Sequence, residues 1–159
     1  MELVTLLFYP SFLLIMFILT LIFIPKKDYK EFFIYGLLVG ALGDMLVVGL
    51  MQNLFQVMWF KNMGIFAVLG QNLLSPPSWL VTVMLFLRFL PHRPWFRYVY
   101  IFTFACFSVA YGILVRNANL YDFYAWLYPY VIFFIFLGWW SFAAYLFLKT
   151  SSLAEQKID

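Results

Sequence analysis

A stretch of twenty residues, apolar except for one carboxylate, constrains the fold of this chain more than any other feature. Phe32–Met51 reads FFIYGLLVGALGDMLVVGLM. As a helix rising about 1.5 Å per residue, it can cross the roughly 30 Å hydrocarbon layer of a bilayer. Its carboxylate, Asp44, is costly in hydrocarbon unless a partner, a proton or water accompanies it. The segment therefore predicts a transmembrane helix whose carboxylate faces other parts of the protein.

The composition of the whole chain supports a membrane location. Hydrophobic residues make up 66% of the 159 residues and charged residues only 11%. A water-soluble domain of this size could not bury so much apolar surface, whereas a bilayer is itself an apolar solvent. We therefore expect an integral membrane protein whose main partner is the lipid bilayer.

Apolar runs along the chain predict an all-α, polytopic membrane helix bundle with five transmembrane helices. The expected spans cover approximately residues 3–24, 32–51, 66–87, 98–115 and 124–148. They form a single transmembrane domain, residues 1–148, and residues 149–159 are expected to be a short, disordered cytoplasmic tail. Residues 52–65 are too polar to span and too apolar for water, which predicts a re-entrant or interfacial hairpin.

The distribution of basic residues predicts the orientation. With five spans, two basic residues, Lys61 and Arg116, fall on one side. The eight on the other side are Lys26, Lys27, Lys30, Arg88, Arg93, Arg97, Lys149 and Lys157. Because short cytoplasmic loops are rich in lysine and arginine, we expect the N-terminus outside and the C-terminus in the cytoplasm of a plasma-membrane protein. The same pattern explains the positive net charge without nucleic acid as a partner.

Three glycines in the second span form a small-residue face beside the carboxylate. Gly36 and Gly40 have the spacing of a GxxxG motif, and Gly43 extends the same face. We expect this face to pack against another helix and so to keep Asp44 away from lipid. Asp44 is then either a proton- or cation-binding group or a buried structural acid that is neutral or hydrogen-bonded, and we favour the structural interpretation.

The third predicted span carries the candidate partners of the carboxylate. If the second and third spans are antiparallel neighbours, Gln71 and Asn72 lie at a depth similar to that of Asp44. Carboxamides can hydrogen-bond a carboxylate in either protonation state. The candidate intramembrane polar site therefore comprises Asp44, Gln71, Asn72 and Ser75.

Two consecutive prolines, Pro76 and Pro77, interrupt the third predicted span near its middle. They remove two amide donors, so the helix there is either kinked or broken. A broken helix at this depth would line a solute or ion site, as it does in transporters. We favour a kink packed against neighbouring helices.

Several kinds of chemistry find no support in the sequence. The single cysteine, Cys106, excludes an internal disulfide, and we expect it to be buried as a small apolar side chain. We find no spacing typical of metal ligands, no nucleophile–base pair and no phosphate-binding loop. No catalytic residue, metal or other cofactor is therefore expected.

The order of these features resembles a group of small, functionally uncharacterised five-span membrane proteins of spore-forming Gram-positive bacteria. The segments that carry the resemblance are IPKKDYKEF, YGLLVGALGDML, the aromatic segment before a PP-containing span, FLPHRPWFRY and a Tyr/Trp-rich last span. The resemblance implies a topology and no activity. Over one span, IYGLLVGALGDM also resembles the glycine–aspartate helix of the MreD family of rod-shape proteins, which implies a docking surface within a membrane complex.

Three functions remain open at this point. The first, which we favour, is an interaction or scaffolding subunit that binds another membrane protein, or itself through the Gly36/Gly40/Gly43 face. The second is a small permease or a proton or ion pathway that uses Asp44, and the third is an intramembrane enzyme. A sealed carboxylate would favour the scaffold, whereas a polar path to Asp44 would favour the permease.

Overall fold

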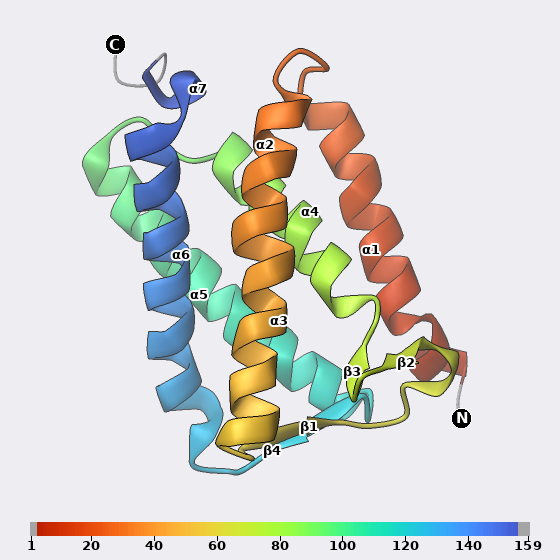
Figure 1. Ribbon diagram of the computed structural model, residues 1–159. Helices are drawn as coiled ribbons and strands as arrows, with labels where there is room; N and C mark the ends of the chain where they lie inside the picture. Colours follow the sequence, from red (N-terminus) through yellow and green to blue (C-terminus); the bar gives the residue numbers. More distant parts are fainter. Residues whose placement is uncertain (1–2, 156–159) are drawn as a thin grey trace.

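Helices account for most of the chain (Figure 1), and the computed structural model describes residues 3–155, with the side chains of residues 5–154. The α-helices are α1 (Leu3–Phe23), α2 (Tyr29–Tyr35), α3 (Leu42–Gly49), α4 (Ser75–Arg88), α5 (Pro94–Asn117), α6 (Ile132–Thr150) and α7 (Ser152–Glu155). The π-helical segments are η1 (Gly36–Ala41), η2 (Leu50–Leu54) and η4 (Leu127–Val131), and η3 (Gly64–Phe66) is a 3₁₀ turn. The short strands are β1 (Met58–Phe60), β2 (Ala67–Val68), β3 (Gln71–Asn72) and β4 (Tyr121–Phe123).

Among the described residues, four helices are long and apolar enough to cross a membrane. They run over Thr5–Phe23, Tyr29–Leu54, Pro94–Asn117 and Leu127–Thr150, and the second joins α2, η1, α3 and η2 into one rod. Large apolar side chains cover their outer surfaces; Ile22 and Leu46, for example, are 66% and 69% exposed. Water would penalise this surface and a bilayer would not, which indicates a membrane protein. The expected helical fold class and four of the expected long helices are confirmed.

The third predicted span is different in the structure. Phe66–Leu74 is not a regular helix, and α4 begins only at Ser75 and has 14 residues. At 1.5 Å per residue it is about 21 Å long, too short to cross the hydrocarbon layer alone. Pro76 and Pro77 lie in the first turn of α4, so the expected kink is wrong. Proline is accommodated there because the first amide groups of a helix have no intrahelical acceptor.

Two short antiparallel pairs occupy one end of the bundle, where a single hairpin at residues 52–65 was expected. β2 and β3 form a hairpin whose turn contains Leu69 and Gly70, both with positive φ. β1 instead pairs with β4, which follows α5 in the chain. The N-terminal end of α1 lies at the same end of the bundle, whereas the α1–α2 and α4–α5 connections and α7 lie at the opposite end (Figure 1).

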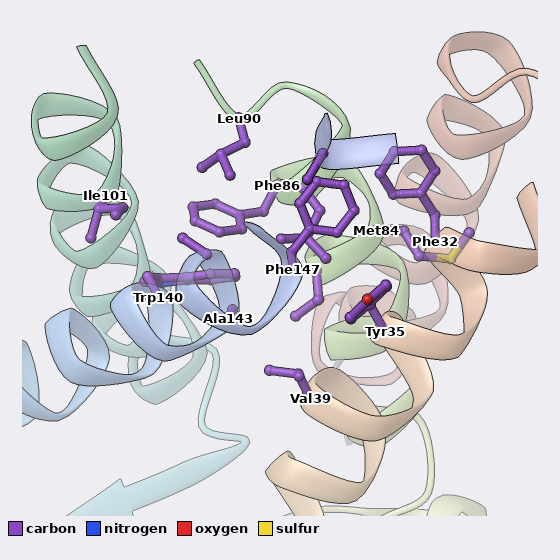
Figure 2. Close-up of a cluster of buried hydrophobic side chains, with 14 of the residues drawn as sticks. Phe32, Tyr35, Val39, Met84, Phe86, Leu90, Ile101, Trp140, Ala143 and Phe147 are labelled. Carbon is purple, nitrogen blue, oxygen red and sulfur yellow. The ribbon is translucent and has the colours of Figure 1, made fainter. Parts of the chain in front are cut away.

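The main apolar core lies toward the end of the bundle that carries the α4–α5 connection. Figure 2 shows side chains from α2, α4, α5 and α6 converging there. Phe86, Trp140 and Phe147 are fully buried, and Phe32 stacks on Phe147 with ring centroids 5.6 Å apart. Of the adjacent tryptophans 139 and 140, Trp140 faces the bundle interior.

The glycine face of the second long helix packs inside the same chain. A Cβ atom added at Gly40 would lie 2.6 Å from the carbonyl oxygen of Trp79, and one at Gly36 would lie 2.7 Å from that of Leu80. A Cβ atom at Gly43 would collide with the ring of Trp139. The glycines therefore allow α4 to cross η1 at backbone contact distance, as small residues do in membrane helix pairs.

The start of the expected tail is ordered. After α6, the hydroxyls of Ser151 and Ser152 donate hydrogen bonds to the Glu31 carboxylate, and Ala154 is fully buried. The expectation of disorder is wrong for this part, and residues 156–159 lie outside the described residues.

Cys106 is exposed on the surface of α5, so the expectation that it is buried is also wrong. An apolar neighbourhood in the sequence does not determine which face of a membrane helix a residue occupies, because lipid accepts an apolar side chain as well as the protein interior does.

Candidate functional site

Asp44 lies at the N-terminal end of α3 and is only 7% exposed. The Ser75 hydroxyl donates a hydrogen bond of 2.9 Å to its Oδ2 atom. Ser75 reaches Asp44 because the crossing at Gly40 brings the start of α4 against η1 and α3. The carboxylate also benefits from the positive end of the α4 dipole, an effect of about 0.3–1 kcal/mol at exposed sites.

A small cavity of about 80 Å³ lies against the carboxylate. Because water occupies about 30 Å³ per molecule in the liquid, this space accommodates roughly two water molecules or a group of similar size. The polar side chains lining it come from five parts of the chain: α1, α3, α4, α5 and the segment from β4 to α6. They are Tyr9, Asp44, Ser75, Trp79, Ser108, Tyr111, Tyr121, Tyr128 and Trp139.

Two buried polar atoms beside this cavity have no hydrogen-bond partner among the described residues. They are the hydroxyl oxygen of Tyr111 and Nε1 of Trp139. Most buried polar groups in proteins are paired, because an unpaired one costs about 1–3 kcal/mol. Both side chains line the cavity, and Tyr111 can act as donor or acceptor and Trp139 as donor.

A pair of tyrosines forms another part of the cavity wall. The hydroxyls of Tyr121 and Tyr128 lie 2.6 Å apart. Gly112 makes room for them, since a Cβ atom there would lie 2.6 Å from the Tyr121 oxygen. Burial raises the pKa of Tyr121 well above its usual value, so this phenol is neutral at physiological pH.

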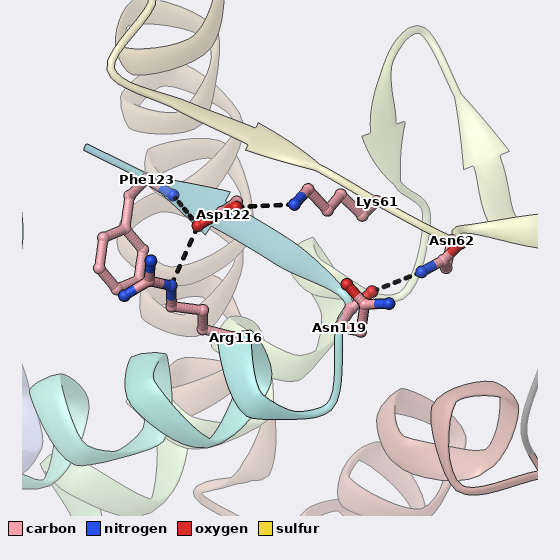
Figure 3. A network of polar contacts seen from close by, with 6 residues as sticks. All are labelled: Lys61, Asn62, Arg116, Asn119, Asp122 and Phe123. Carbon is pink, nitrogen blue, oxygen red and sulfur yellow. Dashed lines mark hydrogen bonds and ion pairs between the residues drawn. The ribbon is translucent and has the colours of Figure 1, made fainter. Parts of the chain in front are cut away.

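The two-stranded ribbon formed by β1 and β4 covers the cavity, which its residues Met58, Phe60 and Tyr121 help to line. Figure 3 shows how ion pairs hold the ribbon: Asp122 accepts from Lys61 Nζ at 2.6 Å and from Arg116 Nε at 3.0 Å. The hydrogen bond from Lys61 and the backbone N–H of Phe123 hold the pKa of Asp122 below its usual value. The ribbon is thus fastened to the end of α5 by charges at its surface.

The residues predicted as the polar site are only partly brought together. Ser75 contacts Asp44 directly, but Gln71 and Asn72 lie on β3 rather than on a helix. Asn72 is 2% exposed, and its side-chain oxygen accepts the backbone N–H of Leu74. Because the chain is extended here, the equal depths expected from helix geometry do not apply to either carboxamide.

Sequence reasoning missed most of the cavity wall, including Tyr9, Ser108, Tyr111 and Trp139. Aromatic residues within apolar runs resemble lipid-facing or interfacial side chains. One signal was present: Ser108, Tyr111 and Gly112 are spaced three and four apart, so they share a helix face opposite apolar positions.

The site contains acceptors and donors suited to binding, and the part of the chain that the structure describes contains no group of three or more potential metal-ligating side chains. A carboxylate surrounded by hydroxyls can hold a cation or exchange a proton. No protein-family model, curated protein or solved structure matches this chain.

Proposed function

We propose that this protein is a small permease or ion pathway that uses Asp44 as its binding group. One observation carries the proposal: a buried carboxylate lies on a cavity beside two buried polar groups with no partner among the described residues. A purely structural acid would be surrounded by satisfied partners and close packing, because unpaired buried groups and voids both lower stability. A solute or ion in the cavity would supply the absent contacts.

The geometry supports this function better than the scaffold that the sequence favours. The scaffold hypothesis requires Gly36, Gly40 and Gly43 to form a free groove for a partner. In the structure, α4 and Trp139 fill that face. Self-association through these glycines would require α4 to move away from η1, which would also remove Ser75 from Asp44.

Five membrane crossings, with the N-terminus outside and the C-terminus cytoplasmic, form part of the proposal. α4, preceded by the irregular Phe66–Leu74 segment, would provide the third crossing. The connections that carry the predicted cytoplasmic lysines and arginines share one end of the bundle, which supports this orientation (Figure 1). The cavity would then open toward the outer half of the membrane. The resemblance to small bacterial five-span proteins points to a bacterial plasma membrane.

A flux measurement in liposomes tests this function. Purified protein would be reconstituted with trapped indicators for protons, Na⁺ and K⁺, and a gradient of each ion would be applied. We expect flux of at least one ion, with a rate about tenfold or more lower in Asp44→Asn.

Asp28→Asn is the matched control, since it makes the same chemical change in the α1–α2 connection, far from the cavity. It should retain the full rate. Flux of equal rate in Asp44→Asn would contradict the role of this carboxylate, and absence of flux for every ion would return the scaffold to first place.

A further inference from the structure

A second cavity, of about 300 Å³, adjoins the one at Asp44. The two share four lining residues: Tyr9, Trp79, Ser108 and Tyr111. We refer to the first as the carboxylate cavity and to the second as the lateral cavity. Together they reach the lower end of the size range of drug-sized binding sites.

The two cavities differ in chemistry. Among the described residues, Asp44 is the charged side chain that lines the carboxylate cavity, and no lysine or arginine lines either cavity. The lateral cavity is lined mainly by apolar side chains of α1 and α5, such as Phe12, Phe104 and Leu114. Its polar groups are already used in part, because the Trp140 indole N–H donates to the Ser108 hydroxyl at 2.9 Å. The combined site is thus anionic at one end and apolar at the other.

We propose that this combined site binds an amphipathic organic cation, with a monovalent ammonium head at Asp44 and an apolar body in the lateral cavity. The proposal rests on the proposed function in placing the ligand at Asp44, and it names the ligand class. An ammonium group is stabilised by a carboxylate and by the faces of aromatic rings. The aromatic walls of the carboxylate cavity include Tyr9, Tyr111 and Trp139.

The hydrogen bonds of such a head can be assigned to groups in the carboxylate cavity. A primary ammonium has three donors, and Asp44 and the Tyr111 oxygen can accept two of them. The volume of about 80 Å³ leaves room for one water molecule beside the head. That water accepts the third donor, and Asp44 can accept a hydrogen bond from it in turn. A buried ion pair is stable only when its remaining donors and acceptors are satisfied in this way.

The lateral cavity provides a route from the bilayer. Phe107 and Leu114, which border it on α5, are 66% and 57% exposed on the apolar outer surface of the bundle. An amphipathic amine partitions into the membrane, with its apolar body among the lipid chains. Moving that body sideways into the lateral cavity exchanges one apolar environment for another, so the head group determines selectivity.

A binding experiment separates the two ends of the ligand. Radiolabelled n-hexylamine would be equilibrated with the full chain in lipid nanodiscs at neutral pH, and binding to empty nanodiscs would be subtracted. Ethylamine, which carries the same head without the apolar body, and 1-hexanol, which has the body without the charge, would compete. We expect saturable binding of hexylamine, weaker competition by ethylamine and little competition by 1-hexanol.

Two variants locate the head and the body. Asp44→Asn should weaken hexylamine binding by about tenfold or more, whereas the control Asp28→Asn should not change it. Ala110→Phe adds a ring to the lateral cavity at a residue that is itself exposed. It should weaken the binding of hexylamine. The affinity for ethylamine, measured by displacing labelled ethylamine with unlabelled ethylamine, should be unchanged.

The outcomes distinguish the ligand class from the proposed function. Equal binding to wild type and Asp44→Asn, or 1-hexanol competing as well as hexylamine, would overturn the ligand assignment. Unchanged hexylamine binding in Ala110→Phe would overturn the placement of the apolar body. Hexylamine binding without ion flux would support the amine site and contradict the ion pathway. Asp44-dependent ion flux without amine binding would support the ion pathway and contradict the amine site.

Discussion

The two ends of this bundle differ in how closely their side chains pack. At the end that carries the α4–α5 connection, Phe86, Trp140 and Phe147 are fully buried and their rings pack closely with neighbours. At the other end, a short ribbon covers the carboxylate cavity, which is lined by a buried carboxylate and by two side chains whose polar atoms have no partner among the described residues. In a bilayer, apolar burial alone does little to hold helices together, so packing contacts must supply the stability. We infer that the packed end stabilises the fold and allows the cavity end to remain loosely packed.

The largest effect is expected when one aromatic ring is deleted at each end of the bundle, which tests this difference in packing directly. Phe86 lies with its ring centroid 4.5 Å from that of Trp140, and Phe86→Ala should lower the free energy of unfolding by about 3 kcal/mol because it opens a new void. Phe136 is only partly buried and already borders the carboxylate cavity, so Phe136→Ala should cost less than Phe86→Ala. Titration with a denaturing detergent in mixed micelles would measure both. Equal losses would show that the two ends are packed alike.

A smaller effect is expected at the helix crossing that joins the two ends. Gly40→Ala should destabilise the protein by about 1–3 kcal/mol, because the new methyl group meets the backbone of α4 rather than a flexible side chain. Gly138 is the matched control: a Cβ atom there has no neighbour within 4 Å. Gly138→Ala should therefore be neutral or stabilising by up to about 1 kcal/mol. The same detergent titration applies, and a tolerated Gly40→Ala would argue against the close crossing.

The smallest effect is expected at the ribbon. The lowered pKa of Asp122 means that its ion pairs stabilise the folded state above the unfolded-state pKa of about 3.9 and are lost as the pH falls through the folded-state value. Because the pairs lie near the surface, Asp122→Asn should cost under about 1 kcal/mol at neutral pH, and less at high salt.

Hydrogen exchange of the β1 and β4 amides would detect this loosening. Exchange should be faster in Asp122→Asn than in wild type at neutral pH, while Asp28→Asn should leave it unchanged. Exchange at the packed end should be the same in all three proteins. Faster exchange throughout the bundle would show that the ribbon and the core unfold together.

Local patterns in the sequence were sufficient to predict the long helices. Runs such as Phe32–Met51 combine length with apolar composition, and few structures other than a membrane helix satisfy both. The same criterion failed at Phe66–Leu87, because it ignores backbone conformation: Leu69 and Gly70 have positive φ, and the prolines begin a helix rather than interrupt one.

The candidate site was predictable only in part, since it depends on contacts between distant segments. Asp44 stands out because a carboxylate in an apolar run is costly, whereas its contact with Ser75 depends on how α4 crosses the second long helix. In the ribbon, Trp59 of β1 lies opposite Asp122 of β4. Because these strands are far apart in the sequence, no local pattern predicts their pairing. Tyr111 and Trp139 resemble lipid-facing aromatic residues until the fold shows that their polar atoms are buried.

The pairing of β1 with β4 has a consequence for the order in which the protein is made. β1 is synthesised well before its partner strand, which leaves the ribosome only after α5. Until then, the second long helix and α4 can already cross at Gly40, but the paired ribbon does not yet cover the carboxylate cavity. A nascent chain at this stage would leave the carboxylate cavity uncovered on the side where the ribbon later lies. The membrane-insertion machinery must therefore accept an intermediate in which this cavity is still open.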